Sequence, residues 1–439
     1  MSQRLIRPGY RERHVDHRLE AMLETFGAVE LTGPKWCGKT WTGFAHATSA
    51  ERLDDQETYN RVILAPETAL LGSQPRLIDE WQEVPSVWDE VRRAVDDSGS
   101  RPGQFILTGS TRPKIVDEGR EEEDLPGKQV HHSGTGRIKR LRMWPMTLAE
   151  QGESSATTSL AALFDGEFEP SRRETSLDEV ARWCCRGGWP VNLGKSDEAA
   201  FETSLAYLES VYEVSIPSMR LSPATAQSLV EAIAVNLAQS PTKETLALDM
   251  AGGGASTLPA ASTIDRYLDA LRRLFLVDDL PGWEPPLRAK ARVRVRPKRY
   301  FADPSLAAAT LGATPKALMR DTQTLGNLFE TLVIRDLNAF CATYRGLGTR
   351  LGYYRDQYGL EVDAVVEKDG RWGAIEIKLS SAKIDDAVKN LLRLRERVAG
   401  NPAARNTEPA FLAVVVGRGD MAYRRSDGIY VIPAATLTA

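Results

Sequence analysis

The stretch Gly33-Pro34-Lys35-Trp36-Cys37-Gly38-Lys39-Thr40 decides how the first third of this chain folds. It fits the pattern G-x-x-x-x-G-K-[ST] and follows the apolar run from Phe26 to Leu31, which we expect to be a strand. Glycine at both ends lets the backbone N–H groups turn inward around phosphate oxygens, and the helix starting near Lys39 adds the positive end of its dipole. All eight residues are therefore candidate nucleotide ligands. Lys39 is expected to reach the β- and γ-phosphates, and the Thr40 hydroxyl to hold Mg²⁺.

A glycine-rich turn could fit this pattern by chance, but the ends of two later strands favour a phosphate-binding loop. Arg76-Leu77-Ile78-Asp79-Glu80 is a short apolar strand that ends in two acids. We expect Asp79 to hold Mg²⁺ through water and Glu80 to polarise the attacking water. The run from Gln104 to Ser110 is a second buried-type strand, with Thr108 and Ser110 as candidate sensors of the γ-phosphate. Each run could instead end in a solvated turn, but the three motifs in this order predict ATP as the ligand.

Composition points to a multi-domain chain with a weakly acidic balance. The chain has 439 residues and a formal net charge of −4, so any contact with nucleic acid must come from a local basic patch. No apolar run approaches the roughly 20 residues that span a bilayer, and the polar start from Met1 to Arg13 lacks the apolar core of a signal peptide. We therefore expect a cytoplasmic protein without a membrane partner.

The pattern along the chain predicts an α/β multi-domain protein. Strand and helix patterns alternate from about Leu19 to Glu150, which is typical of a parallel sheet with phosphates at its carboxyl edge. The Ser/Thr/Gly-rich stretch from Gly152 to Ser176 predicts a linker or a weakly ordered crossing, and helical spacing follows it. We expect an ATPase domain at residues 1–155, a linker and helical lid-like region at 156–225, a winged-helix-like region at 226–305 and a C-terminal domain at 306–439.

A helical, basic region lies in the middle of the chain. The helical runs from Ala226 to Gln239 and from Ser262 to Phe275 resemble a helix-turn-helix, with Ser262 or Thr263 as N-cap of the second. Bases then alternate with small or apolar residues, which predicts a strand with its charges on one face. We call this set the basic ribbon: Arg288, Lys290, Arg292, Arg294, Arg296 and Lys298. It could be the wing of a winged helix that binds DNA phosphates, or an edge strand whose bases pair with acidic neighbours.

The C-terminal third contains a second chemical constellation. Glu330 lies on an amphipathic helix, Asp363 on one predicted strand, and Glu376 and Lys378 on the same face of the next strand. Three carboxylates and a lysine at one sheet edge can hold a divalent metal, with Asp363 and Glu376 as ligands, and activate water against a phosphodiester. Ordinary surface alternation also produces an E-x-K strand.

The whole pattern resembles the prokaryotic ATPases that join an AAA+-type P-loop domain to a C-terminal domain of unknown function with a restriction-endonuclease-like, PD-(D/E)XK-type fold. The resemblance covers nearly all of the chain and rests on the stretches at residues 33–40, 77–82, 106–110, 136–150, 187–190, 326–330, 354–363 and 376–378. It implies that Lys39, Thr40, Asp79 and Glu80 serve the ATPase. It likewise places Glu330, Asp363, Glu376 and Lys378 in a nuclease-like site. Trp41 departs from the family pattern, which has a small residue there.

These observations predict slow Mg²⁺-dependent ATP hydrolysis coupled to a nuclease-like domain that acts on nucleic acid. Two alternatives stay open: an ATP-dependent switch that binds DNA or a protein through a non-cleaving nuclease fold, and an ATPase whose C-terminal domain only mediates assembly. ATPases of this class are often completed by an arginine from a second copy, so a homo-oligomer is expected. The candidates for that arginine are Arg137, Arg140 and Arg142, although at least two of them are expected to form ordinary surface pairs.

Overall fold

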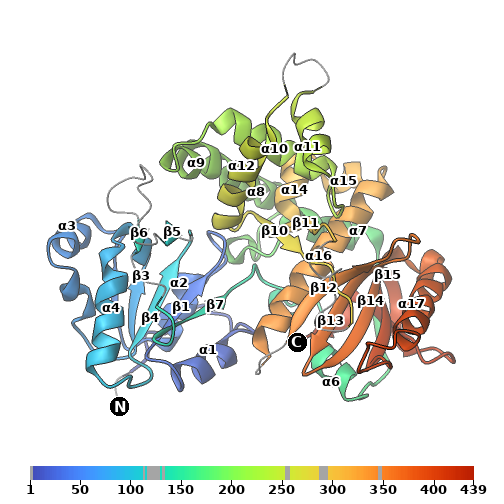
Figure 1. The fold of residues 1–439 in the computed structure, drawn as a ribbon, viewed down its shortest axis with the longest axis horizontal. Helices are drawn as coiled ribbons and strands as arrows, with labels where there is room; N and C mark the ends of the chain where they lie inside the picture. The colour runs from blue at the N-terminus through green and yellow to red at the C-terminus, as the bar shows by residue number, and fades with distance from the viewer. Residues whose placement is uncertain are drawn as a thin grey trace. The chain divides into compact units, whose positions relative to one another are not determined.

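The computed structural model describes residues 3–111, 134–252, 258–285, 295–344 and 349–439, and the backbone of two short strands, β5 (Lys114–Ile115) and β6 (Gln129–Val130). The chain forms two compact units, shown in Figure 1. The first comprises Met1–Trp144 with Arg273–Phe275, and the second comprises Pro145–Arg272 with Leu276–Ala439.

The first unit is built on a five-stranded sheet in the order β2-β3-β4-β1-β7. Every neighbouring pair in it is parallel, as the alternation of the sequence predicts. The strand β4 lies between the strand that precedes the glycine-rich loop and the strand that ends in two acids. The five strands are β1 (Ala28–Thr32), β2 (Ser49–Arg52), β3 (Arg76–Asp79), β4 (Phe105–Gly109) and β7 (Ile138–Arg142).

Helices pack against both faces of this sheet, because successive strand residues point to opposite sides. On one face, Ile78 and Leu107 share a core with Trp88 of helix α4 (Ser86–Asp97). On the other face, α2 (Lys39–His46) lies so near that a Cβ added to Gly43 would come within 2.7 Å of a Leu77 methyl carbon. The first unit also contains α1 (Asp16–Leu23) and α3 (Gln56–Leu64).

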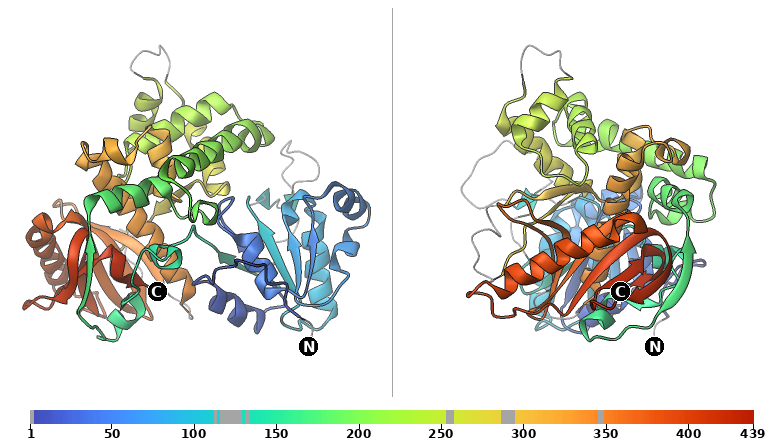
Figure 2. Two further views of the ribbon diagram at one scale, coloured as in Figure 1. Left: turned by 180° about the vertical axis from the view of Figure 1, so that it is seen from behind. Right: turned by 90° about the vertical axis from the view of Figure 1, so that its right-hand side faces the viewer.

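The second unit contains a mixed sheet in the order β12-β13-β14-β15-β16. The pairs from β12 to β14 are antiparallel, and those from β14 to β16 are parallel. Helix α17 (Ile384–Ala399) covers one face through residues such as Leu391 and Leu394, and Figure 2 shows it lying across the strands. The strands are β12 (Arg350–Arg355), β13 (Glu361–Lys368), β14 (Arg371–Ser380), β15 (Phe411–Arg424) and β16 (Tyr430–Pro433).

Helix α16 (Thr322–Thr343) packs against the opposite face of this sheet. A Cβ added to Gly417 of β15 would lie 3.4 Å from the ring of Phe329, so the helix and the strand are in close contact. Residues 322–424 therefore follow the order helix, three strands, helix, strand.

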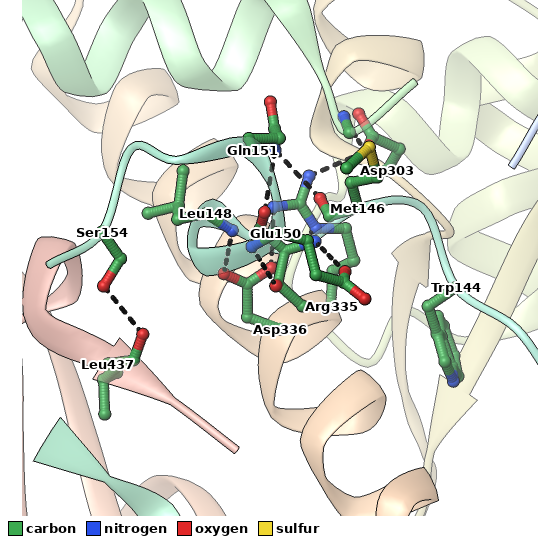
Figure 3. A network of polar contacts seen from close by, with 12 residues as sticks. Trp144, Met146, Leu148, Glu150, Gln151, Ser154, Asp303, Arg335, Asp336 and Leu437 are labelled. Carbon is green, nitrogen blue, oxygen red and sulfur yellow. Dashed lines mark hydrogen bonds and ion pairs between the residues drawn. The ribbon is translucent and has the colours of Figure 1, made fainter. Parts of the chain in front are cut away.

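A buried arginine anchors α16 in the second unit, as Figure 3 shows. The Arg335 guanidinium donates to Asp303 Oδ2 at 2.8 Å and twice to Asp336 Oδ1, at 2.7 and 2.9 Å. Asp303 Oδ2 also accepts from the backbone N–H of Gly188, and Asp336 Oδ2 from that of Leu148. Three segments far apart in the sequence are thereby tied to one helix.

The prediction of a linker from Gly152 to Ser176 is wrong, because part of this stretch forms strands that pair with C-terminal strands. Strand β9 (Ser171–Thr175) pairs antiparallel with β15, and β8 (Thr158–Ser159) pairs parallel with β17 (Leu437–Thr438). The partners of these short polar strands lie more than 200 residues away, so no local pattern indicates the pairing. The finer domain boundaries at residues 155, 225 and 305 stay predictions.

Helices dominate the middle of the second unit, and two local expectations fail there. Helix α12 (Ala261–Arg273) begins before Ser262, so Ser262 and Thr263 lie inside it and neither is its N-cap. In the described part of the basic ribbon, the strand begins only at β11 (Lys298–Phe301), which pairs antiparallel with β10 (Val277–Leu280). The other helices are α5 (Leu148–Gln151), α6 (Leu160–Phe164), α7 (Leu177–Arg186), α8 (Asp197–Ser210), α9 (Ile216–Ser218), α10 (Pro223–Val235), α11 (Lys243–Met250), α14 (Pro304–Thr310) and α15 (Pro315–Leu318).

Most of the basic ribbon lies outside the described residues, namely Arg288, Lys290, Arg292 and Arg294. Arg296 is described and exposed, whereas Lys298 is buried. None of the described helices is both long enough and apolar enough to cross a bilayer.

Candidate functional site

The glycine-rich loop connects β1 to α2 at the carboxyl edge of the parallel sheet. Gly38 has φ +105° and Gly33 φ +154°, and a Cβ on Gly33 would lie 2.3 Å from the carbonyl oxygen of Met143. Glycine is therefore required at both positions. The Lys39 ammonium donates to the carbonyl oxygens of Gly33 and Pro34, at 3.0 and 2.7 Å, and so lies inside the loop where a phosphate chain would compete for it.

The other loop residues differ in how far their side chains are buried. Cys37 is buried under the loop, Trp36 is 44% exposed with φ +62°, and burial lowers the pKa of Lys35. Arg13, which the sequence motifs did not single out, is buried and donates to the carbonyl oxygen of Cys37 at 2.7 Å. This contact braces the loop from outside the motif, and no sequence pattern around Arg13 indicates it.

The two predicted strand ends meet the loop at Asp79. Its Oδ1 atom accepts hydrogen bonds from the Thr40 hydroxyl at 2.9 Å and from the Thr108 hydroxyl at 2.5 Å. Burial raises the pKa of Asp79, and the bonds from Thr108 and Thr40 partly offset the rise. A hydroxyl and a carboxylate in contact beside a phosphate-type loop are the protein ligands that Mg²⁺ takes while it keeps most of its waters.

Glu80 is held in an unusual backbone conformation directly after that strand. Its φ is +54°, in the left-handed region, and its N–H donates to the Thr108 hydroxyl at 3.1 Å. Its Oε2 atom accepts from the Ser110 hydroxyl at 3.2 Å and from the Gln82 amide. A non-glycine residue in this conformation costs energy and is typical of functional sites. The carboxylate is oriented by two side chains, as a group that positions a water requires.

The three candidate arginines lie on or beside β7. Arg137 forms an ion pair with Asp96 at 2.7 Å, and Arg140 pairs with the buried Glu30 at 2.7 Å. The Arg142 guanidinium stacks over the Trp144 ring at 3.7 Å from its centre. Arg137 therefore forms an ordinary surface pair, whereas Arg140 pairs with a buried carboxylate, so the prediction of surface pairs for at least two of the three is confirmed for Arg137.

The second constellation converges on Asp363, as predicted. Asp363 Oδ2 accepts from the Ile377 N–H at 2.9 Å and from the Lys378 ammonium at 3.0 Å. The same ammonium contacts Glu376 Oε2, and Asn390 of α17 donates to Glu376 Oε1 at 3.1 Å. Glu376 and Lys378 therefore share a face of β14 and meet a carboxylate from β13.

The helix residue Glu330 joins this group through a second lysine, Lys298. The Lys298 ammonium lies 3.1 Å from Glu330, 2.8 Å from Glu361 and 3.6 Å from Asp363. The Tyr300 hydroxyl donates to Glu330 at 2.7 Å. Sequence reasoning missed Lys298 and Tyr300 here. It assigned Lys298 to the basic ribbon, although the apolar neighbours Tyr300 and Phe301 are a weak signal of a buried strand.

Burial and charge separate the carboxyl groups of this cluster. Burial and the nearby Asp363 raise the pKa of Glu376 to about 8. Burial would also raise the pKa of Asp363, but the Lys378 and Lys298 ammonium groups and the Ile377 N–H hold it below its usual value. Burial and Asp363 raise the pKa of Glu330. Asp363 is thus the ionised member, and Glu376 is the member that takes up a proton near neutral pH.

The donor set fits one small divalent cation. In the described part of the chain, no group of three or more His, Cys, Asp or Glu is arranged to hold a metal. Asp363 Oδ2 and Glu376 Oε2 nevertheless both contact one cation, the Lys378 ammonium. Mg²⁺ commonly takes one or two carboxylates and keeps its waters, so these two oxygens could hold it once the ammonium moves aside.

Three family models match this chain. Residues 25–151 match an AAA domain. The N-terminal unit is similar to AAA-type P-loop ATPases. Residues 177–317 match a domain of unknown function, DUF8612, and residues 325–437 match another, DUF4143. These matches support the predicted ATPase domain and assign no activity to the C-terminal residues.

Two uncharacterized proteins and two solved structures of low sequence identity are similar to this chain. Two uncharacterized proteins, from Mycobacterium tuberculosis and Mycobacterium bovis, are each 28% identical over 370 residues, which is 83% of this chain and 73% of theirs. Among solved structures, a Walker-type ATPase of Pyrococcus abyssi is 12% identical with a TM-score of 0.41, covering 70% of this chain and 98% of its own. RuvB of Thermotoga maritima is 17% identical with a TM-score of 0.27, covering 61% and 89%.

Proposed function

We propose that the protein is a Mg²⁺-dependent ATPase whose C-terminal carboxylate and lysine site is of the nuclease type and acts on nucleic acid. The contact of Asp79 with Thr40 and Thr108 carries the first half, because it unites the three motifs on one metal-type oxygen. Lys39 and the loop N–H groups would bind the phosphates, and Glu80 would orient the attacking water. Mg²⁺ held by Thr40 and Asp79 would neutralise charge on the β- and γ-phosphates.

Lys39→Ala tests the ATPase half. We expect it to abolish ATP binding and turnover, because it removes the ammonium that lies on the Gly33 and Pro34 carbonyl oxygens inside the loop. The matched control is Lys139→Ala, which removes an exposed lysine on β7 of the same unit. Phosphate release and nucleotide affinity are measured on both variants. Binding that survives in Lys39→Ala at the control's level would contradict the assignment.

The convergence of Asp363, Glu376 and Lys378 supports the nuclease half. A metal at Asp363 and Glu376 would activate water and stabilise charge on a phosphodiester, and Lys378 would lie beside the same centre. The test is cleavage of plasmid and of single-stranded DNA with Mg²⁺ or Mn²⁺, with and without ATP. Asp363→Ala should remove cleavage, whereas Asp386→Ala, an exposed carboxylate on α17, should retain it. Equal cleavage by the two variants would point to a contaminating nuclease.

A second function is favoured by the two lysines of the cluster. Lys378 and Lys298 already compensate its carboxylates without a metal, as in a scaffold that binds but does not cut. In that case the protein is an ATP-dependent switch that binds DNA, through the basic ribbon of a winged-helix-like region, or binds a protein partner. Absence of metal-dependent cleavage by the wild type, together with DNA affinity that changes with ATP, would favour the switch.

We also propose a homo-oligomer with a shared ATPase site. Its support is that the three candidate arginines lie on β7 or directly before it, and β7 is at an edge of the described sheet beside the P-loop strand β1: Arg137, Arg140 and Arg142. ATP turnover per subunit should then fall on dilution. A specific activity that is independent of concentration, with a monomeric mass, would contradict the proposal.

A further inference from the structure

The Lys298 ammonium occupies the centre of a group of carboxylates. Oxygen atoms of Glu361, Glu330 and Asp363 lie 2.8, 3.1 and 3.6 Å from its Nζ atom. These carboxylates come from two elements: β13 supplies two and α16 supplies one. Oxygen atoms from separate elements thus converge on one cation, and that cation is part of the chain.

The backbone holds Lys298 rigidly in this position. It opens β11, where it pairs with Leu280 of β10, and the following N–H, that of Arg299, donates to the Gln239 carbonyl oxygen at 3.0 Å. The side chain is only 4% exposed, and its Nζ atom lies 5.5 Å from the centre of the Tyr353 ring. An ammonium buried this deeply stays charged only when it is fully compensated. The Lys298 side chain is therefore shielded from solvent among the described residues.

The two lysines of the cluster differ in this respect. The Lys378 side chain is 22% exposed, so its ammonium can turn toward solvent and leave the oxygens of Asp363 and Glu376 to a metal. Lys298 has no such freedom. The two faces of Asp363 thus meet one displaceable cation, at Oδ2, and one permanent cation, at Oδ1.

We propose that Lys298 is a built-in cation that occupies the second cation position of this site, so that the site takes one divalent metal ion and not two. This inference deepens the proposed nuclease-type function and rests on the metal position at Asp363 and Glu376. Nuclease-type reactions use one or two metal ions, and in two-metal sites the ions lie about 3.5–4 Å apart, sharing a carboxylate between them. Asp363 is the carboxylate so shared here, between Lys378 on one side and Lys298 on the other.

The charge balance is consistent with a single metal. Four carboxylates and two ammonium groups leave two negative charges when all of them are ionised, which one divalent ion neutralises. A second divalent ion would leave a buried positive excess beside Lys298. Removal of the Lys298 ammonium would instead leave Glu330, Glu361 and Asp363 around an uncompensated position of the size of a small cation.

The experiment counts Mn²⁺ ions bound per full-length chain, without nucleotide, by calorimetric titration and electron paramagnetic resonance. Lys298→Met should bind one more Mn²⁺ than the wild type. Lys389→Met, which removes an exposed lysine of α17, is the matched control and should bind the wild-type number. Asp363→Asn separates the two proposals. If the wild type and Asp363→Asn bind equal numbers, the proposed metal position at Asp363 and Glu376 fails and the inference fails with it. If Asp363→Asn binds one Mn²⁺ fewer and Lys298→Met gains none, only the inference fails.

An unchanged count in folded Lys298→Met overturns the inference. If Lys298→Met is unfolded in EDTA, its refolding in Mn²⁺, followed by circular dichroism, is measured in place of the number of bound ions. Recovery of the fold by Mn²⁺, with no recovery in EDTA, supports the inference. A variant that stays unfolded in saturating Mn²⁺ overturns it, because the three carboxylates then provide no site for the metal.

Discussion

Replacement of Arg335 by methionine should destabilise the second unit more than any surface change. Arg335 and Asp303 are 1% and 0% exposed as side chains, and Asp336 is 7% exposed. The variant removes three charge-assisted hydrogen bonds at 2.7–2.9 Å and leaves two buried carboxylates without their cation. Breaking a buried pair by removing one partner costs about 3–5 kcal/mol, even though methionine fills much of the volume.

The remaining bonds keep the loss near this range. Asp303 would still accept from the N–H groups of Gly188 and Ser305, and Asp336 from that of Leu148. These bonds solvate the carboxylates in part but do not neutralise them. Burial raises the pKa of Asp336, and loss of the Arg335 guanidinium would raise it further, so the penalty should shrink as the pH falls below neutral and should be greatest at neutral pH and above.

The assay is urea unfolding of the full chain, followed by tryptophan fluorescence and circular dichroism at neutral and acid pH. The matched control is Arg393→Met, an exposed arginine on α17, which should stay within about 0.5 kcal/mol of the wild type. A free energy of unfolding for Arg335→Met within about 1 kcal/mol of the wild type at neutral pH would refute the reasoning. A loss of unfolding free energy in Arg335→Met that grows as the pH falls would also refute it.

The two candidate sites and the basic ribbon each give a further measurable outcome. Glu80→Gln should keep ATP binding and slow turnover by about 10²- to 10⁴-fold, since it removes the carboxylate that orients water; equal phosphate release would exclude that role. Affinity for Mn²⁺ at the C-terminal site should rise as the pH increases through about 8, where Glu376 loses its proton. A Mn²⁺ affinity that calorimetry finds to be the same at every pH would contradict this. Alanine at three positions of the basic ribbon, Arg292, Arg294 and Arg296, should weaken DNA binding at every sequence alike. It should also reduce the slope of log affinity against log salt concentration by roughly three units. Identical slopes for the wild type and this variant in fluorescence anisotropy would favour a structural edge or a protein partner.

Much of both candidate sites is determined by local sequence. The two motif glycines at Gly33 and Gly38 are required by the backbone, and the strand ends at Asp79 and Thr108 follow from short apolar runs in a parallel sheet. The carboxyl ends of neighbouring parallel strands meet at one edge, so chain order alone brings these side chains together. Period-two alternation likewise places Glu376 and Lys378 on one face of β14.

Tertiary structure alone decided the environment of Lys298. In the sequence it is one of several alternating bases, and such bases are normally solvated or pair at a surface. Only the pairing of β11 with β10 and the contact with Glu330 of α16 bury it among carboxylates. The same holds for Arg335 and Arg13, because Asp303 lies 32 residues from Arg335 and Cys37 lies 24 residues from Arg13. Local sequence specifies conformation and the direction of a side chain, whereas burial of a charge depends on distant segments that no local pattern names.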